Sequence, residues 1–120
     1  MSQVLAVIED DNEIREVLSD FLTSEGYTVI AATNGRDGLE RLRAAAELPK
    51  VILLDVMMPD MDGEQFRALQ REEPRLAAIP VVVMSAGADL AAQVTKLGAA
   101  GSLKKPFVDL ELILSTVAGF

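Results

Sequence analysis

Five short apolar runs alternate along the chain with longer segments in which apolar residues recur at helical spacing. The runs cover residues 4–8, 28–32, 51–54, 81–84 and 101–104. Three of the runs show no polar alternation, which is typical of strands covered by helices on both faces and therefore of a parallel sheet. Because parallel crossovers are nearly always right-handed, the alternation predicts an α/β fold, a doubly wound five-stranded parallel sheet with five helices.

The first intervening segment has the clearest helical pattern. Asp11 or Asn12 can cap its start, and Gly26 is placed to end it. Its apolar stripe is formed by Ile14, Val17, Leu18, Phe21 and Leu22. Further helices are expected after residue 34 and before Pro49, from about 62 to Pro74, over about 89–97, and from about 109. The last of these should pack some of Leu110, Leu112, Ile113 and Val117.

Length and composition favour one domain spanning residues 1–120, because 50% hydrophobic residues can bury one substantial core. The net charge of -8 argues against nucleic acid or an anionic membrane as partner, since polyanion binding needs clustered Lys and Arg. A basic or polar protein surface is the favoured target. No apolar stretch approaches the roughly 18 to 20 residues that span a bilayer, and no signal peptide is evident, so we expect a cytoplasmic protein.

The chain contains no cysteine and no histidine. The absence of cysteine excludes disulfides and zinc-thiolate sites, and the absence of histidine excludes the commonest general base and a phosphohistidine. Any chemistry must therefore use carboxylates, hydroxyls and amines.

Charged residues follow several of the predicted strands. Glu9, Asp10 and Asp11 come after the first, Asp55 after the third, and Lys105 after the fifth. Ligands of such folds bind beyond the carboxyl ends of the strands, where the strand order reverses. The spacing thus predicts one crevice with four carboxylates and one ammonium group, suited to a divalent cation and a phosphoryl group.

Clustered carboxylates repel one another, and a bound Mg²⁺ would relieve this. We assign Asp10 and Asp55 as direct ligands and expect Glu9 to act mainly through water. Alternatively, the acidic triplet only favours the positive N-terminus of the following helix, worth roughly 0.3 to 1 kcal/mol per charge. For the triplet alone both explanations stay open, and we assign Asp11 to the second.

Asp55 follows a wholly apolar strand, so its carboxylate is placed to act as a nucleophile toward phosphorus. Lys105 could neutralise charge on the phosphoryl group, although a Lys-Lys pair is commonly just exposed. Pro106 restrains the backbone there, and the preceding bond could be cis. Ser85 ends the fourth run and could reach a phosphoryl oxygen, drawing the 87–88 loop with it, or could simply be a turn residue.

Four motifs together resemble the receiver domain of two-component response regulators. They are Ile-Glu-Asp-Asp at 8–11, Leu-Asp-Val-Met-Met-Pro-Asp-Met-Asp-Gly at 54–63, Met-Ser-Ala at 84–86 and Lys-Lys-Pro-Phe at 104–107. The resemblance covers essentially the whole chain. It implies a flavodoxin-like sheet of strand order 2-1-3-4-5, the order of chemotaxis members of this family.

The resemblance also implies roles for individual residues. These are Glu9 and Asp10 as the acidic pair, Asp55 as phosphoacceptor, the carbonyl of Met57 as a metal ligand, Ser85 as the switch hydroxyl, Lys105 as the phosphate-contacting lysine, and a cis bond before Pro106. One position departs from the family pattern: Ser102 stands where members often carry the Tyr or Phe that moves with the switch hydroxyl. We therefore hypothesise that phosphorylation reshapes mainly the 87–89 loop.

The implied function is transfer of a phosphoryl group from a sensor histidine kinase or phosphotransfer protein onto Asp55, dependent on Mg²⁺ and self-catalysed, with a signal to a downstream protein. Turnover is not expected, because a phosphohydrolase would need an acid where Met57 stands. A phosphorylation-independent interaction module is the other alternative, although such a module would be expected to lose the acids or Lys105. We expect the chain to be a monomer or a weak dimer. We also expect it to have no room for a DNA-binding module. Two interpretations stay open: a stand-alone receiver, or a receiver that is part of a longer regulator.

Overall fold

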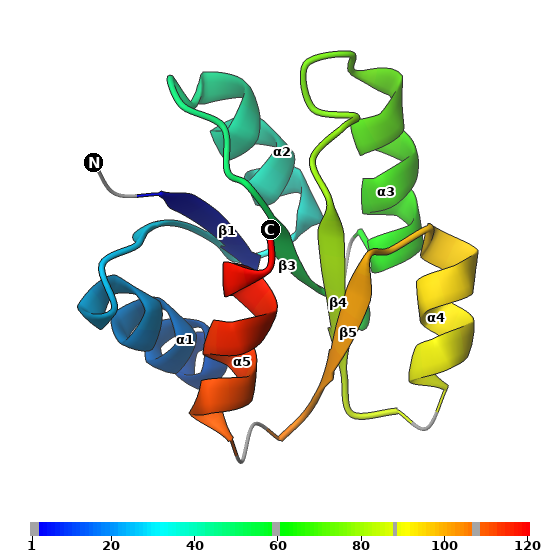
Figure 1. Ribbon diagram of the computed structural model, residues 1–120. Helices are drawn as coiled ribbons and strands as arrows, with labels where there is room; N and C mark the ends of the chain where they lie inside the picture. Colours follow the sequence, from blue (N-terminus) through cyan, green and yellow to red (C-terminus); the bar gives the residue numbers. More distant parts are fainter. Residues whose placement is uncertain (1–2, 59–60, 88, 107–108) are drawn as a thin grey trace.

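The computed structural model describes residues 3–58, 61–87, 89–106 and 109–120. Strands and helices alternate along these residues as predicted (Figure 1). The elements are β1 (Val4–Ile8), α1 (Asn12–Ser24), β2 (Thr28–Ala32), α2 (Gly35–Ala44), β3 (Ile52–Asp55), α3 (Gly63–Glu72), β4 (Val81–Ser85), α4 (Leu90–Leu97), β5 (Gly101–Lys104) and α5 (Leu110–Ala118). Among the described residues, no helix combines the length and apolar character needed to cross a membrane.

The described strands form one five-stranded sheet of order β2-β1-β3-β4-β5, and every neighbouring pair is parallel. This confirms the predicted fold and strand order. β1 pairs with β2 on one side and with β3 on the other, so the strand order reverses between β1 and β3. A crevice opens at such a reversal, beyond the carboxyl ends of the strands.

Helices cover both faces of the sheet: α1 and α5 lie on one face, and α2, α3 and α4 on the other (Figure 1). Neighbouring strand residues point to opposite faces. Leu53 packs with α1 and α5, whereas Ile52 and Leu54 pack with α2, α3 and α4. Burial on both faces explains why β1 is wholly apolar in sequence and why β3 and β4 are apolar up to their last residues, Asp55 and Ser85.

Asp11 caps α1, since its Oδ1 accepts a hydrogen bond from the backbone N–H of Ile14 at 3.1 Å. This agrees with the assignment of Asp11 to the helix N-terminus. One residue of the predicted apolar stripe is misplaced: Val17 is 57% exposed, because it lies at the margin of the stripe, while Leu18 and Leu22 are buried. In α5, Ile113 and Val117 are buried as expected.

Two arginines of α3 hold the end of α4. Arg67 donates from Nε to the carbonyl of Leu97 at 2.9 Å and from Nη2 to that of Gly98 at 3.1 Å. Arg71 donates to the same Leu97 carbonyl at 2.8 Å. These carbonyls lack partners within the helix, so the guanidinium groups act as a C-terminal cap supplied by another helix. At its start, α4 has no side-chain hydrogen bond from Asp89.

Candidate functional site

The charged residues singled out in the sequence meet at the carboxyl edge of the sheet. Glu9 directly follows β1, Asp55 and Ser85 end β3 and β4, and Lys105 directly follows β5. A pocket of about 680 Å³ lies between them. It is lined by Glu9, Asp10, Asp11, Ile14, Asp55, Val56, Met57, Ser85, Ala86, Gly87, Asp89, Gln93 and Lys105. The four carboxylates and one ammonium group expected from the sequence therefore line this crevice, together with a fifth carboxylate, Asp89.

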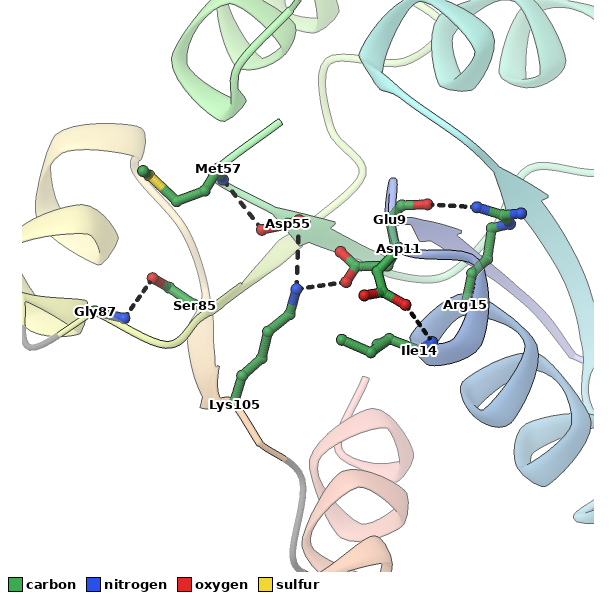
Figure 2. Close-up of polar contacts among 9 residues, drawn as sticks. All are labelled: Glu9, Asp11, Ile14, Arg15, Asp55, Met57, Ser85, Gly87 and Lys105. Atoms are coloured by element: carbon green, nitrogen blue, oxygen red, sulfur yellow. Dashed lines mark hydrogen bonds and ion pairs between the residues drawn. The ribbon is translucent and has the colours of Figure 1, made fainter. Parts of the chain in front are cut away.

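Lys105 lies at the centre of this group (Figure 2). Its Nζ is 2.5 Å from Oε1 of Glu9 and 3.3 Å from Oδ2 of Asp55. The backbone N–H of Lys105 donates to the carbonyl of Ser85 at 3.0 Å, which ties the end of β5 to β4. The peptide bond between Lys105 and Pro106 is cis, as the resemblance implies. Lys105 is thus a partly buried cation between two acids, not one half of an exposed lysine pair.

The environment shifts the pKa values of the two buried carboxyl groups, Glu9 and Asp55, in opposite directions. Burial, followed by the nearby carboxylate of Asp55, raises the pKa of Glu9 to about 8, although Lys105 acts in the opposite direction. Burial also acts to raise the pKa of Asp55, but the carboxyl of Glu9, the N–H of Met57 and the charge of Lys105 outweigh it, so this pKa is lowered. At neutral pH Glu9 holds a proton and Asp55 is ionised.

Burial and neighbouring charges also shift the pKa values of Asp10 and Lys105. Burial and then Asp55 raise the pKa of Asp10. Burial would lower the pKa of Lys105, but its contacts with Glu9 and Asp55 dominate and raise it. The ammonium form of Lys105 is therefore favoured.

The acidic residues fit a hard divalent cation. Glu9, Asp10 and Asp55 each offer a carboxylate oxygen, and these oxygens lie within 4.8 Å of one another. Oε2 of Glu9 is buried and makes no hydrogen bond within the described part of the chain. Such an orphaned buried oxygen costs free energy unless a cation or proton satisfies it. Oxygen ligands in this number suit Mg²⁺.

Met57 contacts Asp55 through its backbone: its N–H donates to Oδ1 of Asp55 at 3.1 Å (Figure 2). Its side chain is 75% exposed at the mouth of the pocket. The assignment of the Met57 carbonyl as a metal ligand stays a prediction.

Ser85 is buried at the pocket, where its Oγ accepts a hydrogen bond from the backbone N–H of Gly87 at 3.0 Å. The hydroxyl is therefore linked to the segment between β4 and α4, as the loop hypothesis requires, although Ala88 lies outside the described residues. Ser102 is exposed on the edge strand β5, opposite Val83 of β4. No ring fills that position.

The sequence reasoning missed two residues that shape this site. Gln93 lines the pocket from α4, and Arg15 of α1 donates to the carbonyl of Glu9 at 2.9 Å. Neither carries a sequence signal, because a polar residue on a helix looks the same whether it faces solvent or a neighbouring loop. The motif positions Pro59, Asp60 and Phe107 lie outside the described residues.

Comparisons with solved structures agree with this geometry. The chemotaxis protein CheY4 of Vibrio cholerae superposes with a TM-score of 0.88 at 28% identity, covering 99% of this chain and 98% of that one. A response regulator receiver protein from Pseudomonas putida gives a TM-score of 0.88 at 26% identity, covering 100% and 98%. The flavodoxin-like fold is therefore that of chemotaxis-type receivers.

Sequence comparisons point the same way. The transcriptional regulatory protein GltR of Pseudomonas aeruginosa is 36% identical over 111 residues, which cover 91% of this chain and 45% of that protein. The DNA-binding transcriptional regulator NtrC of Escherichia coli is 39% identical over 106 residues, covering 87% of this chain and 22% of that protein. This chain thus spans about half or less of these curated relatives. The family model for the response regulator receiver domain matches residues 5–118. By sequence, fold and site, this chain belongs to the family of response regulator receiver domains.

Proposed function

We propose that residues 1–120 act as one receiver domain in which Asp55 accepts a phosphoryl group from the phosphohistidine of a sensor histidine kinase or phosphotransfer protein. The observation that carries this proposal is the position of Asp55, whose Oδ2 lies 3.3 Å from the ammonium group of Lys105 in an open pocket; its lowered pKa favours the carboxylate. A nucleophilic carboxylate and a fixed cation are the two groups that such a transfer needs from the protein.

In the proposed step, a carboxylate oxygen of Asp55 forms a bond to phosphorus while the bond from phosphorus to the donor nitrogen breaks. The imidazole leaves with the bonding electron pair and takes up a proton. The transition state is loose, so the protein contributes mainly alignment and neutralisation of charge on the phosphoryl oxygens. The N–H of Met57 orients the Asp55 carboxylate, and the ammonium group of Lys105 faces the incoming oxygens.

Glu9, Asp10 and Asp55 are the residues that would hold Mg²⁺. When bound, the ion supplies positive charge toward the phosphoryl oxygens. Glu9 would give up its proton on binding, and its free Oε2 is available to face the ion or a water bound to it. The reaction is therefore expected to depend on Mg²⁺.

The proposed signal starts at Ser85. Its hydroxyl holds the N–H of Gly87 before phosphorylation and would turn toward the phosphoryl group afterwards. Because Ser102 provides no ring on β5, the change is expected to concentrate in the 87–89 segment. Backbone chemical shifts with and without beryllofluoride would contradict this if the largest changes lay on α5.

We place this activity in the cytoplasm, with a downstream protein as partner and no direct contact with nucleic acid or membrane. The relatives named as transcriptional regulators are longer than this chain, so a link to transcription belongs to those proteins. Turnover is not expected, because Met57 offers no acid beside Asp55. The phosphorylation-independent interaction module is disfavoured because the acids, Asp55 and Lys105 are all in place.

The test is intact-mass analysis after incubation with acetyl phosphate and Mg²⁺. Wild type should gain one phosphoryl group, and Asp55→Asn should gain none. Because the chain contains no histidine, the phosphoryl group cannot be carried on a histidine side chain of this protein. Equal labelling of Asp55→Asn, or no labelling of folded wild type at any Mg²⁺ concentration, would refute the proposal.

A further inference from the structure

We infer that Arg15 is a positioning residue for the cation site, holding the turn that presents Glu9 and Asp10. Arg15 lies in the first turn of α1 and reaches back over the end of β1 (Figure 2). Its Nη1 donates to the carbonyl of Glu9 at 2.9 Å, and its Nη2 donates to Oδ1 of Asn12 at 2.5 Å. One guanidinium group thus bonds to Glu9, which follows β1, and to Asn12, the first residue of α1, on either side of Asp10 and Asp11.

The backbone of Glu9 is fixed on both sides. Its N–H donates to the carbonyl of Ala32 in β2 at 3.1 Å, and its carbonyl accepts from Arg15. The orientation of the peptide group after Glu9 is therefore set by Arg15. The side chain of Glu9 contacts Lys105, and the same peptide group leads directly into Asp10, which is solvent-exposed. Asp11 anchors the same turn by capping α1.

Electrostatics and geometry make opposite predictions for Arg15. A guanidinium near three carboxylates that hold a cation repels that cation, so removing its charge should strengthen Mg²⁺ binding if charge alone mattered. If Arg15 instead orders the ligands, removing it should weaken binding. Residues that hold metal ligands in place typically change metal affinity by about 10- to 100-fold when they are lost.

This inference rests on the proposed Mg²⁺ site, and its test is a Mg²⁺ titration followed by backbone chemical shifts or calorimetry. Arg15→Gln should weaken Mg²⁺ binding by about tenfold. Arg15→Lys keeps the charge but lacks the planar fork that bonds to both acceptors, so it should recover part of the loss. The matched control is Arg36→Gln, an exposed residue in the first turn of α2 that makes no side-chain hydrogen bond or ion pair with described residues; it should leave affinity unchanged or slightly higher.

Asn12→Ala supplies a second test that leaves the charge of Arg15 intact. It removes only the second acceptor of the guanidinium, and Mg²⁺ binding should weaken, though less than in Arg15→Gln. This variant and Arg15→Lys carry the test if Arg15→Gln fails to fold. Phosphorylation of Arg15→Gln by acetyl phosphate should recover at saturating Mg²⁺, because Asp55 and Lys105 are untouched.

Unchanged or tighter Mg²⁺ binding in the folded Arg15 and Asn12 variants would overturn the positioning role and leave the proposed function standing. Absence of Mg²⁺ binding to the wild type would instead refute the proposed metal site, and the inference would fall with it.

Discussion

Binding of Mg²⁺ should release a proton from Glu9, and the pH dependence of that release is a quantitative test of the site. Burial and the nearby Asp55 raise the pKa of Glu9 to about 8, so the acid is protonated at neutral pH. A divalent cation beside it favours the carboxylate and displaces the proton. The perturbation is therefore a Mg²⁺ titration between pH 6 and pH 9.

The expected size follows from that pKa. A group that titrates at about 8 is about 0.9 protonated at pH 7 and about 0.1 protonated at pH 9. Each bound Mg²⁺ should release about 0.9 proton at pH 7 and about 0.1 proton at pH 9. Because the proton competes with the metal, the apparent Mg²⁺ affinity should rise about tenfold between pH 6 and pH 7 and level off above pH 8.

Calorimetry in two buffers of different ionisation enthalpy measures the number of protons released. Glu9→Gln is the control, since an amide of similar size has no proton to lose in this range. Absence of release at pH 7 in the wild type would show that Glu9 is ionised in the metal-free protein and that Lys105 prevails over burial. Equal release in Glu9→Gln would show that the proton comes from another group.

Three further predictions concern stability, each measured by urea unfolding in EDTA. Because the pKa of Glu9 rises from 4.5 to about 8 on folding, the folded state binds more protons, and the free energy of unfolding should fall as pH rises across that interval; Glu9→Gln should flatten the slope, and an unchanged slope would contradict it. Gly98→Ala should cost about 0.5 to 1.5 kcal/mol more than Gly26→Ala, the net contribution of the hydrogen bond from Arg71 to the carbonyl of Leu97. Both glycines have positive φ, but only a Cβ at 98 would displace the end of Arg71, 2.2 Å away; equal costs would refute this. Arg67→Met should cost about 2 to 4 kcal/mol, and more than Arg71→Met, because Arg67 is buried and donates to two carbonyls of the α4 end; the reverse order would be incompatible with this cap.

The apolar pattern predicted the strands and helices because burial on both faces of the sheet leaves a direct mark on the sequence. It did not determine the strand order, which came from the resemblance, since uniformly apolar strands carry no information about their neighbours. Val17 shows the limit of helical spacing: a residue at the margin of an apolar stripe can face solvent without breaking the period. Contacts from Arg15 and Arg67 to backbone carbonyls could not be predicted, because any residue provides a carbonyl.

The sequence also placed the acids together without showing how they differ. Glu9 and Asp55 both follow apolar strands, and residue type alone would give them similar pKa values. The difference arises in three dimensions: Asp55 receives the N–H of Met57, while Glu9 is fully buried and one of its oxygens has no partner within the described residues. Both side chains are buried, so the hydrogen bond from Met57 and the neighbouring charges, and not burial alone, lower the pKa of Asp55 while that of Glu9 is raised.

The attachment of α4 bears on how a change at Asp55 would travel. The end of α4 is held by Arg67 and Arg71 of α3, whereas its start has no side-chain cap and follows the segment tied to Ser85. A helix fixed at one end and free of such a cap at the other responds to a turn of the Ser85 hydroxyl mainly at its start. Ser102, exposed on β5, offers no ring at its position to couple that movement to the sheet edge. Under the proposed function, we therefore expect a change at Asp55 to alter the start of α4 more than α5.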